Sequence, residues 1–95
     1  MWLMTKLIIL ILVLFMNSDR EELTQDIIKI VKNVTHYSAV DRDSSTQNIS
    51  QWDSLAYMSI LSEVELNYEV AVTEENINDF DSIESIVGIV LKKNQ

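Results

Sequence analysis

The chain contains no proline and a single glycine, Gly88. An all-β fold needs turn residues at every corner, and these two residue types supply most such turns. Their near-absence from a chain of 95 residues therefore indicates helices joined by polar loops. A chain of this length is enough for one domain and too short for two.

Apolar stripes at helical spacing predict where the helices lie. They are expected at about 19–35, at about 54–67, in a short segment after Thr73, and after a cap-like sequence at 81–84. Ser18 and Glu21 form a capping-box sequence that predicts the start of the first helix. In the short helix, Ile77 and Phe80 are expected to face inward. The predicted fold class is all-α: a small four-helix bundle with three long helices, one short helix and a long first loop.

Residues 36–51 lack periodicity and contain "DRDSSTQN", whose side chains compete for backbone hydrogen bonds. A loop of this length inside a compact domain is often functional. Asp41 and Asp43 suggest a calcium loop, but no glycine follows at the sixth position and Trp52 stands in place of the bidentate glutamate. No metal site is expected.

The segment 1–16 is apolar apart from Thr5 and Lys6 and is treated as an N-terminal extension to a domain at 17–95. The run from Leu7 to Met16 is too short to span a bilayer, which needs about 20 residues. Three interpretations stay open. The segment is a signal peptide or weak membrane anchor, an apolar helix packing on the domain or on a partner, or a stretch preceding a true start at Met16.

The chain is acidic, with a net charge of -8. Residues 17–95 hold all fifteen acids and six of the seven bases, which gives 6 − 15 = −9. Nucleic acid is therefore not expected as a partner, whereas a basic protein surface is. Cysteine is absent, which excludes disulfides and indicates either a reducing compartment or a helical core that needs no covalent cross-link. A cytoplasmic monomer is expected. Membrane contact is expected only through residues 1–16.

Catalytic machinery is not evident in the sequence. The single histidine, His36, could form a nucleophilic pair with Ser54, but an oxyanion hole usually needs a glycine-bearing turn. The only glycine, Gly88, falls late in the last helix. No glycine-rich phosphate loop and no metal-ligand spacing is present. An enzyme is therefore not expected.

Ser54 lies where the second helix begins, and two interpretations compete for it. It is either the residue that caps the helix or a displayed hydroxyl. Asp53 precedes it and could be the cap, which would leave the Ser54 hydroxyl free. A helix N-terminus also favours an attached phosphate, because its N–H groups are unpaired and its dipole is positive there.

The "DSL" at 53–55 resembles the attachment site of acyl carrier proteins. The likeness extends through "WDSLAYMSILSEVELNYEVAV" and "TEENINDFDSIESIVGIV" to their later helices, and through "REELTQDIIKIVKNV" to their first helix. The resemblance covers about 19–92. It implies that a phosphopantetheinyl transferase attaches 4′-phosphopantetheine from coenzyme A to Ser54, using magnesium. The thiol of this arm would hold an acyl or related chain as a thioester.

The resemblance also implies a recognition surface on the second helix, to which Asp53, Leu55, Met58 and Glu65 would belong. Its partners would be acyl-loading and acyl-transferring enzymes with basic patches. In this family the core can open to shelter an acyl chain. An ordinary hydrophobic core would produce the same apolar stripes, so both interpretations stay open. The positions concerned are Leu61, Val64, Tyr68, Ile77, Phe80 and Ile86.

Several positions depart from the pattern of fatty-acid carriers. Gln51 and Trp52 stand where small residues are usual, and Ala56 stands where an acid often follows the leucine. Ser59, Ser62 and Leu66 occupy positions where acidic or bulky apolar recognition residues are common. These departures indicate a specialised, stand-alone carrier serving a biosynthetic cluster. The alternative is a non-catalytic helical interaction module in which Ser54 is only a helix cap.

Overall fold

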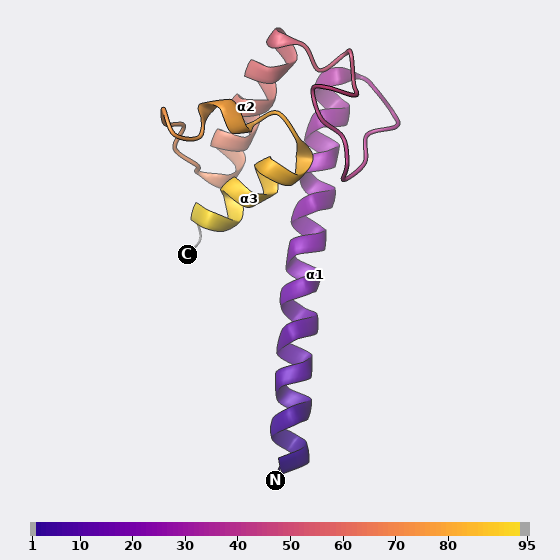
Figure 1. Cartoon of the computed structure of the whole chain (residues 1–95), viewed down its shortest axis with the longest axis vertical. Coiled ribbons are helices and arrows are strands. Elements are labelled where there is room, and N and C mark those ends of the chain that lie inside the picture. Colours follow the sequence, from indigo (N-terminus) through magenta and orange to yellow (C-terminus); the bar gives the residue numbers. More distant parts are fainter. Residues whose placement is uncertain (1, 94–95) are drawn as a thin grey trace.

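The computed structural model describes residues 2–93, and within them it does not describe the side chains of residues 2–3 and 13–18. The elements in chain order are α1 (Trp2–Thr35), α2 (Ser54–Tyr68), the 3₁₀ helix η1 (Ile77–Asp79) and α3 (Ile83–Lys93), shown in Figure 1. Among these residues there is no strand, only an isolated antiparallel bridge between Ser45 and Ser82. The predicted all-α class with four helices is confirmed.

The first helix is much longer than its amphipathic stripe. It was expected to begin near Asp19 but begins at Trp2 and runs for 34 residues, so the predicted start is wrong. Extending an existing helix is cheap, and residues 2–18 hold no glycine or proline to stop it. A capping sequence starts a helix only where the preceding chain is not already helical. Ser18 therefore lies inside α1, and its side chain is outside the described residues.

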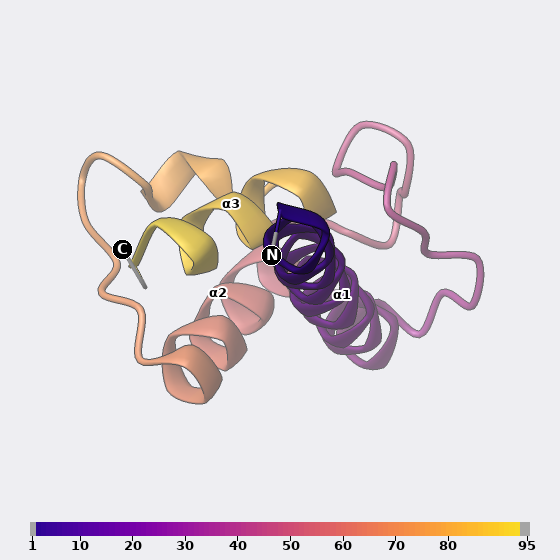
Figure 2. The same cartoon turned by 90° about the horizontal axis from the view of Figure 1, so that it is seen from below.

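Only the second half of α1 belongs to the folded domain. Figure 1 shows the first half projecting away from the other helices, and the molecule measures 56 × 29 × 20 Å. Seen from below in Figure 2, α2 and α3 lie on one side of α1 and the first loop lies on the other. Within the part of the chain that the structure describes, no helix has the length and apolar character needed to cross a membrane.

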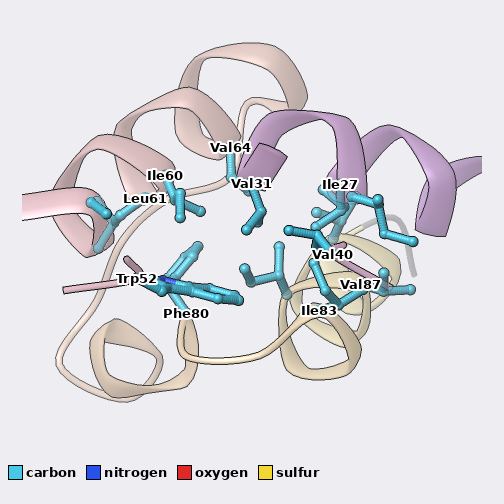
Figure 3. Packing of buried hydrophobic residues seen from close by; sticks show 14 of the residues in the cluster. Ile27, Val31, Val40, Trp52, Ile60, Leu61, Val64, Phe80, Ile83 and Val87 are labelled. Atoms are coloured by element: carbon cyan, nitrogen blue, oxygen red, sulfur yellow. The ribbon is translucent and has the colours of Figure 1, made fainter. Parts of the chain in front are cut away.

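The core forms where α1 packs against α2 and α3. Its largest fully buried side chains come from all three helices and from Phe80 (Figure 3): Ile27, Val31, Ile60, Val64, Ile83, Ile86, Val87 and Val90. The positions in α1 and α3 match the apolar stripes of the sequence. The stripe predicted for the second helix (Leu55, Met58, Leu61, Val64 and Tyr68) is wrong in part, because Leu55 and Met58 are exposed and Ile60, which lies outside it, is buried. Burying an aliphatic or aromatic side chain of this kind stabilises the fold by about 1.5–3 kcal/mol, which makes this cluster the main source of stability.

The first loop, His36 to Asp53, is anchored to the core. Val40, Ile49 and Trp52 are buried although they show no periodicity. Polar side chains shape the turns as expected: the Asp41 carboxylate accepts from the Asp43 N–H at 2.9 Å. The Thr46 N–H donates to the Asp81 carbonyl at 2.9 Å, and the Ile83 N–H donates to the Ser44 carbonyl at 3.1 Å. The loop is therefore held against the start of α3.

The segment between α2 and α3 differs in part from its prediction. The short helix expected after Thr73 begins only at Ile77, as η1, and follows a turn in which the Ile77 N–H is bonded to the Thr73 carbonyl at 2.9 Å. Phe80 is fully buried as expected, but Ile77 is 40% exposed, so its predicted inward orientation is wrong. With three residues a 3₁₀ helix makes a single turn, and here only the residue after it reaches the core. The predicted cap of α3 is confirmed, because the Ser82 hydroxyl accepts from the Ser85 N–H at 3.1 Å.

Candidate attachment site at the start of α2

Asp53 is the residue that caps α2. Its backbone is extended (φ −89°, ψ −171°), and its carboxylate accepts a hydrogen bond from the Ala56 N–H at 2.9 Å. Its carbonyl oxygen accepts the first intrahelical hydrogen bond, from the Tyr57 N–H at 2.8 Å. These are the two bonds of a helix N-cap. The helix start is thus satisfied without any contribution from the next residue.

Ser54, the first residue of α2, is exposed. Its hydroxyl has no hydrogen-bond partner among residues 2–93, so it is not the cap of α2. It stands beside the positive end of the helix dipole, where the first N–H groups of a helix have no intrahelical acceptor. The position leaves a nucleophilic oxygen reachable from solvent in surroundings that favour an attached anion.

The cap predicts its own mutational effect. Replacing Asp53 with alanine is expected to lower the free energy of unfolding by about 1 kcal/mol, because α2 loses the acceptor for the Ala56 N–H. Asp53→Asn keeps an oxygen acceptor and should lose less than half as much. Urea unfolding followed by far-ultraviolet circular dichroism measures both. Equal losses would show that the carboxylate charge, and not the cap bond, stabilises the helix.

A pocket of about 420 Å³ opens beside Ser54. Its lining comes from the first loop, the start of α2 and the segment before α3: Thr46, Trp52, Asp53, Ser54, Tyr57, Met58 and Asp81. Trp52 is only 2% exposed, and its indole N–H has no acceptor in the part of the chain described here. The buried indole fixes the chain immediately before Asp53 and so positions the cap and the serine.

Sequence reasoning treated Trp52 only as a departure from the carrier pattern and missed this anchoring role. The available signal was the spacing to Ile49, three residues earlier, in an otherwise polar loop. Both side chains are buried in the structure. Two apolar residues in a polar loop do not form the repeating pattern of a helix or a strand. Periodicity therefore does not place them in the core.

Tyr57 links α2 to η1 and to Phe80, the residue that follows it. Its hydroxyl donates to the Ile77 carbonyl and accepts from the Phe80 N–H at 3.2 Å. Burial raises the pKa of the Tyr57 phenol above its usual value of 10.0, and the nearby Asp81 and Asp79 carboxylates raise it further, while the Phe80 N–H opposes the shift. The neutral phenol therefore holds one wall of the pocket beside Ser54.

The raised pKa of Tyr57 predicts a pH effect with a definite sign. The folded state favours the protonated phenol, so its contribution to stability is complete below pH 10 and declines as the pH rises through the raised folded pKa. Tyr57→Phe should lower stability near neutral pH, and the difference from wild type should shrink above pH 10. Urea unfolding at several pH values measures it. A constant difference would contradict the assignment.

The residues predicted for partner recognition all lie on the surface. Asp53, Leu55, Met58 and Glu65 are exposed, with Leu55 at 78%. At 100° per residue, positions 55, 58 and 65 fall on one side of α2, opposite its buried residues. Leu66 shares this side and is 77% exposed, so the face has a second large leucine. Their role in recognition stays a prediction.

The six positions considered for sheltering an acyl chain differ in their burial. Leu61, Val64, Phe80 and Ile86 are packed in the core, Tyr68 is partly buried and Ile77 is exposed. A separate pocket of about 610 Å³ lies between α3 and the segment after α2, lined in part by Val70, Asn76 and Ile89. None of the six positions lines this pocket or the one beside Ser54.

His36 lies just after α1, is exposed and has a positive φ of 58°. No hydrogen bond joins it to Ser54 in the described range 2–93. Within the same range, no group of three or more potential metal-ligating side chains comes together. Among the described residues the structure thus offers an exposed serine beside a pocket and no hydrogen-bonded Ser54–His36 pair.

No known protein family, curated protein or solved structure matches this chain. The likeness to acyl carrier proteins therefore stays a prediction drawn from the sequence. The site itself combines a capped helix start, an exposed serine hydroxyl, an adjacent pocket and an exposed apolar face of α2.

Proposed function

We propose that this chain is an acyl carrier protein that holds its cargo on a 4′-phosphopantetheine arm attached to Ser54. The observation that carries the proposal is the division of roles between two neighbouring residues. Asp53 satisfies the helix start, and the Ser54 hydroxyl is left exposed without a partner in the described structure. A serine needed only for folding would be expected to make the cap bond itself.

The residues around Ser54 suit this group chemically. A phosphodiester on its oxygen would lie next to the first N–H groups of α2, where negative charge is favoured. Met58 lines the pocket with apolar surface, and Thr46 and Asp81 add polar groups, a mixture that fits an amide-containing aliphatic arm. When bound, the arm supplies a thiol on a long flexible tether.

The exposed side of α2 supports docking to partner enzymes. Leu55, Met58 and Leu66 present apolar surface, and Asp53 and Glu65 add negative charge. The partners proposed are a phosphopantetheinyl transferase and enzymes that load or remove the acyl chain through basic patches. The chain acts as a non-catalytic, cytoplasmic monomer. The exposed side of α2 carries few acidic residues, which favours a specialised carrier that serves one biosynthetic cluster.

A helical interaction module is the second candidate, because the exposed leucines of α2 would serve docking in either case. Attachment of the phosphopantetheine group distinguishes the carrier from the interaction module. The full chain is incubated with coenzyme A, magnesium and a broad-specificity phosphopantetheinyl transferase, and its intact mass is measured. A carrier gains one phosphopantetheinyl group. A sample that is folded by circular dichroism and gains nothing favours the interaction module.

A further inference from the structure

The first half of α1 is not covered by the rest of the protein. The large apolar side chains of Leu7 to Leu12 are each 55–56% exposed, and Met4 is more exposed still. Figure 1 shows this part of the helix extending away from the domain. The interpretation in which this segment packs on its own domain is therefore contradicted for residues 4–12.

The apolar surface surrounds the helix. Consecutive residues of an α-helix are 100° apart, so the run from Leu7 to Leu12 places large apolar side chains in every direction. A second copy of the chain, or a groove on a partner protein, covers a stripe along one side. A helix that is apolar all round needs a medium that encloses it, and lipid is such a medium.

The charges at the two ends limit how deep this segment can go. No residue between Lys6 and Asp19 is charged. In an α-helix this uncharged stretch is about 18 Å long. That is shorter than the hydrocarbon core of a bilayer, about 30 Å. The long aliphatic stem of a lysine lets its ammonium reach the headgroups while the stem stays in apolar surroundings. Both charges stay at the headgroups if this part of the helix lies nearly parallel to the membrane plane, so the segment fits within a single leaflet.

We propose that the first half of α1 inserts into one leaflet of a lipid bilayer and holds the carrier domain at the membrane surface. Insertion is driven by the apolar side chains and not by charge, because residues 17–95 contain fifteen acids and six bases. An anionic surface would repel this domain, so neutral lipid is the preferred surface. The proposal does not depend on the role of Ser54.

The test is flotation of the full chain with vesicles of phosphatidylcholine. Wild type is expected to float with the vesicles and to stay bound in high salt. Leu10→Glu should weaken partitioning at least about tenfold, because a buried carboxylate is costly in hydrocarbon. Leu66→Glu is the matched control: it is the same substitution at an exposed leucine of α2 and should float like wild type.

Other results would overturn the proposal. Wild type that stays in solution excludes insertion, and sedimentation equilibrium would then show whether a second copy covers the helix instead. Release by high salt would indicate electrostatic adsorption, and equal flotation of both glutamate variants would place binding elsewhere. Ser54→Ala should float like wild type, so a failure of loading and a failure of membrane binding are measured separately.

Discussion

Replacing Ser54 with alanine is expected to abolish attachment of the phosphopantetheine group and to leave the fold intact. The variant lacks the only oxygen to which the group is proposed to be linked. The helix start is unaffected because Asp53 supplies the cap. Stability should therefore stay within about 0.5 kcal/mol of wild type, as for other surface substitutions. Intact mass after incubation with the transferase and urea unfolding measure the two effects.

Ser59→Ala is the matched control for that experiment. Ser59 is also exposed on α2, a little over one turn further along the helix. It should accept the group to the same extent as wild type. Loading of Ser54→Ala, or loss of loading in Ser59→Ala alone, would move the attachment site away from Ser54. Loss in both variants would point to a damaged transferase-binding face.

Replacing Phe80 with alanine is expected to lower the free energy of unfolding by about 3–5 kcal/mol. The ring is fully buried in the shared core, and truncation leaves a cavity that helices fixed by other contacts cannot fill. Small domains are stable by only about 5–15 kcal/mol, so the variant should be partly unfolded at room temperature. Urea unfolding, or a loss of helical circular dichroism without denaturant, measures the effect.

Ile77→Ala tests whether the structure orients this segment correctly. Sequence periodicity predicts that Ile77 and Phe80 both face the core, whereas the structure leaves Ile77 40% exposed. The Ile77 substitution should therefore cost less than about 1 kcal/mol, since little apolar area is lost. Costs of similar size at the two positions would contradict the observed arrangement and support the sequence-based one.

The second helix could be predicted from the sequence almost to the residue. Its expected span was 54–67 and its observed span is Ser54–Tyr68. The span was predicted well because a cap residue marks its start and apolar residues continue along it. The buried face was predicted less well, since Leu55 and Met58 were counted in the stripe and are exposed. The end of α1 at Thr35 was predicted equally well, since polar loop residues follow it. Strong local signals and tertiary packing agree at both places.

Other features could not be read from local patterns. The capping box at Ser18 was misread as a helix start because nothing in it reveals that the preceding residues are already helical. The burial of Val40 and Trp52 depends on the path of the first loop across the core, which no period encodes. Likewise, the orientation of Ile77 is set by the tight turn of η1.

At the candidate site, the sequence indicated Asp53 and Ser54 but not the pocket beside them. That Asp53 could be the cap and leave Ser54 free was anticipated, and the cap bond is present. The pocket beside Ser54 was not anticipated, because its lining is drawn from segments as far apart as Thr46 and Asp81. Long-range proximity of this kind follows from the packing of the helices.

The most direct test of the carrier function is the intact mass of the protein isolated from the cells that naturally make it, with no transferase added. The carrier function predicts a population heavier by one phosphopantetheinyl group, with or without an acyl chain, and fragmentation should locate the group on Ser54. An unmodified chain, in cells where another carrier protein is found modified, would contradict the proposed function.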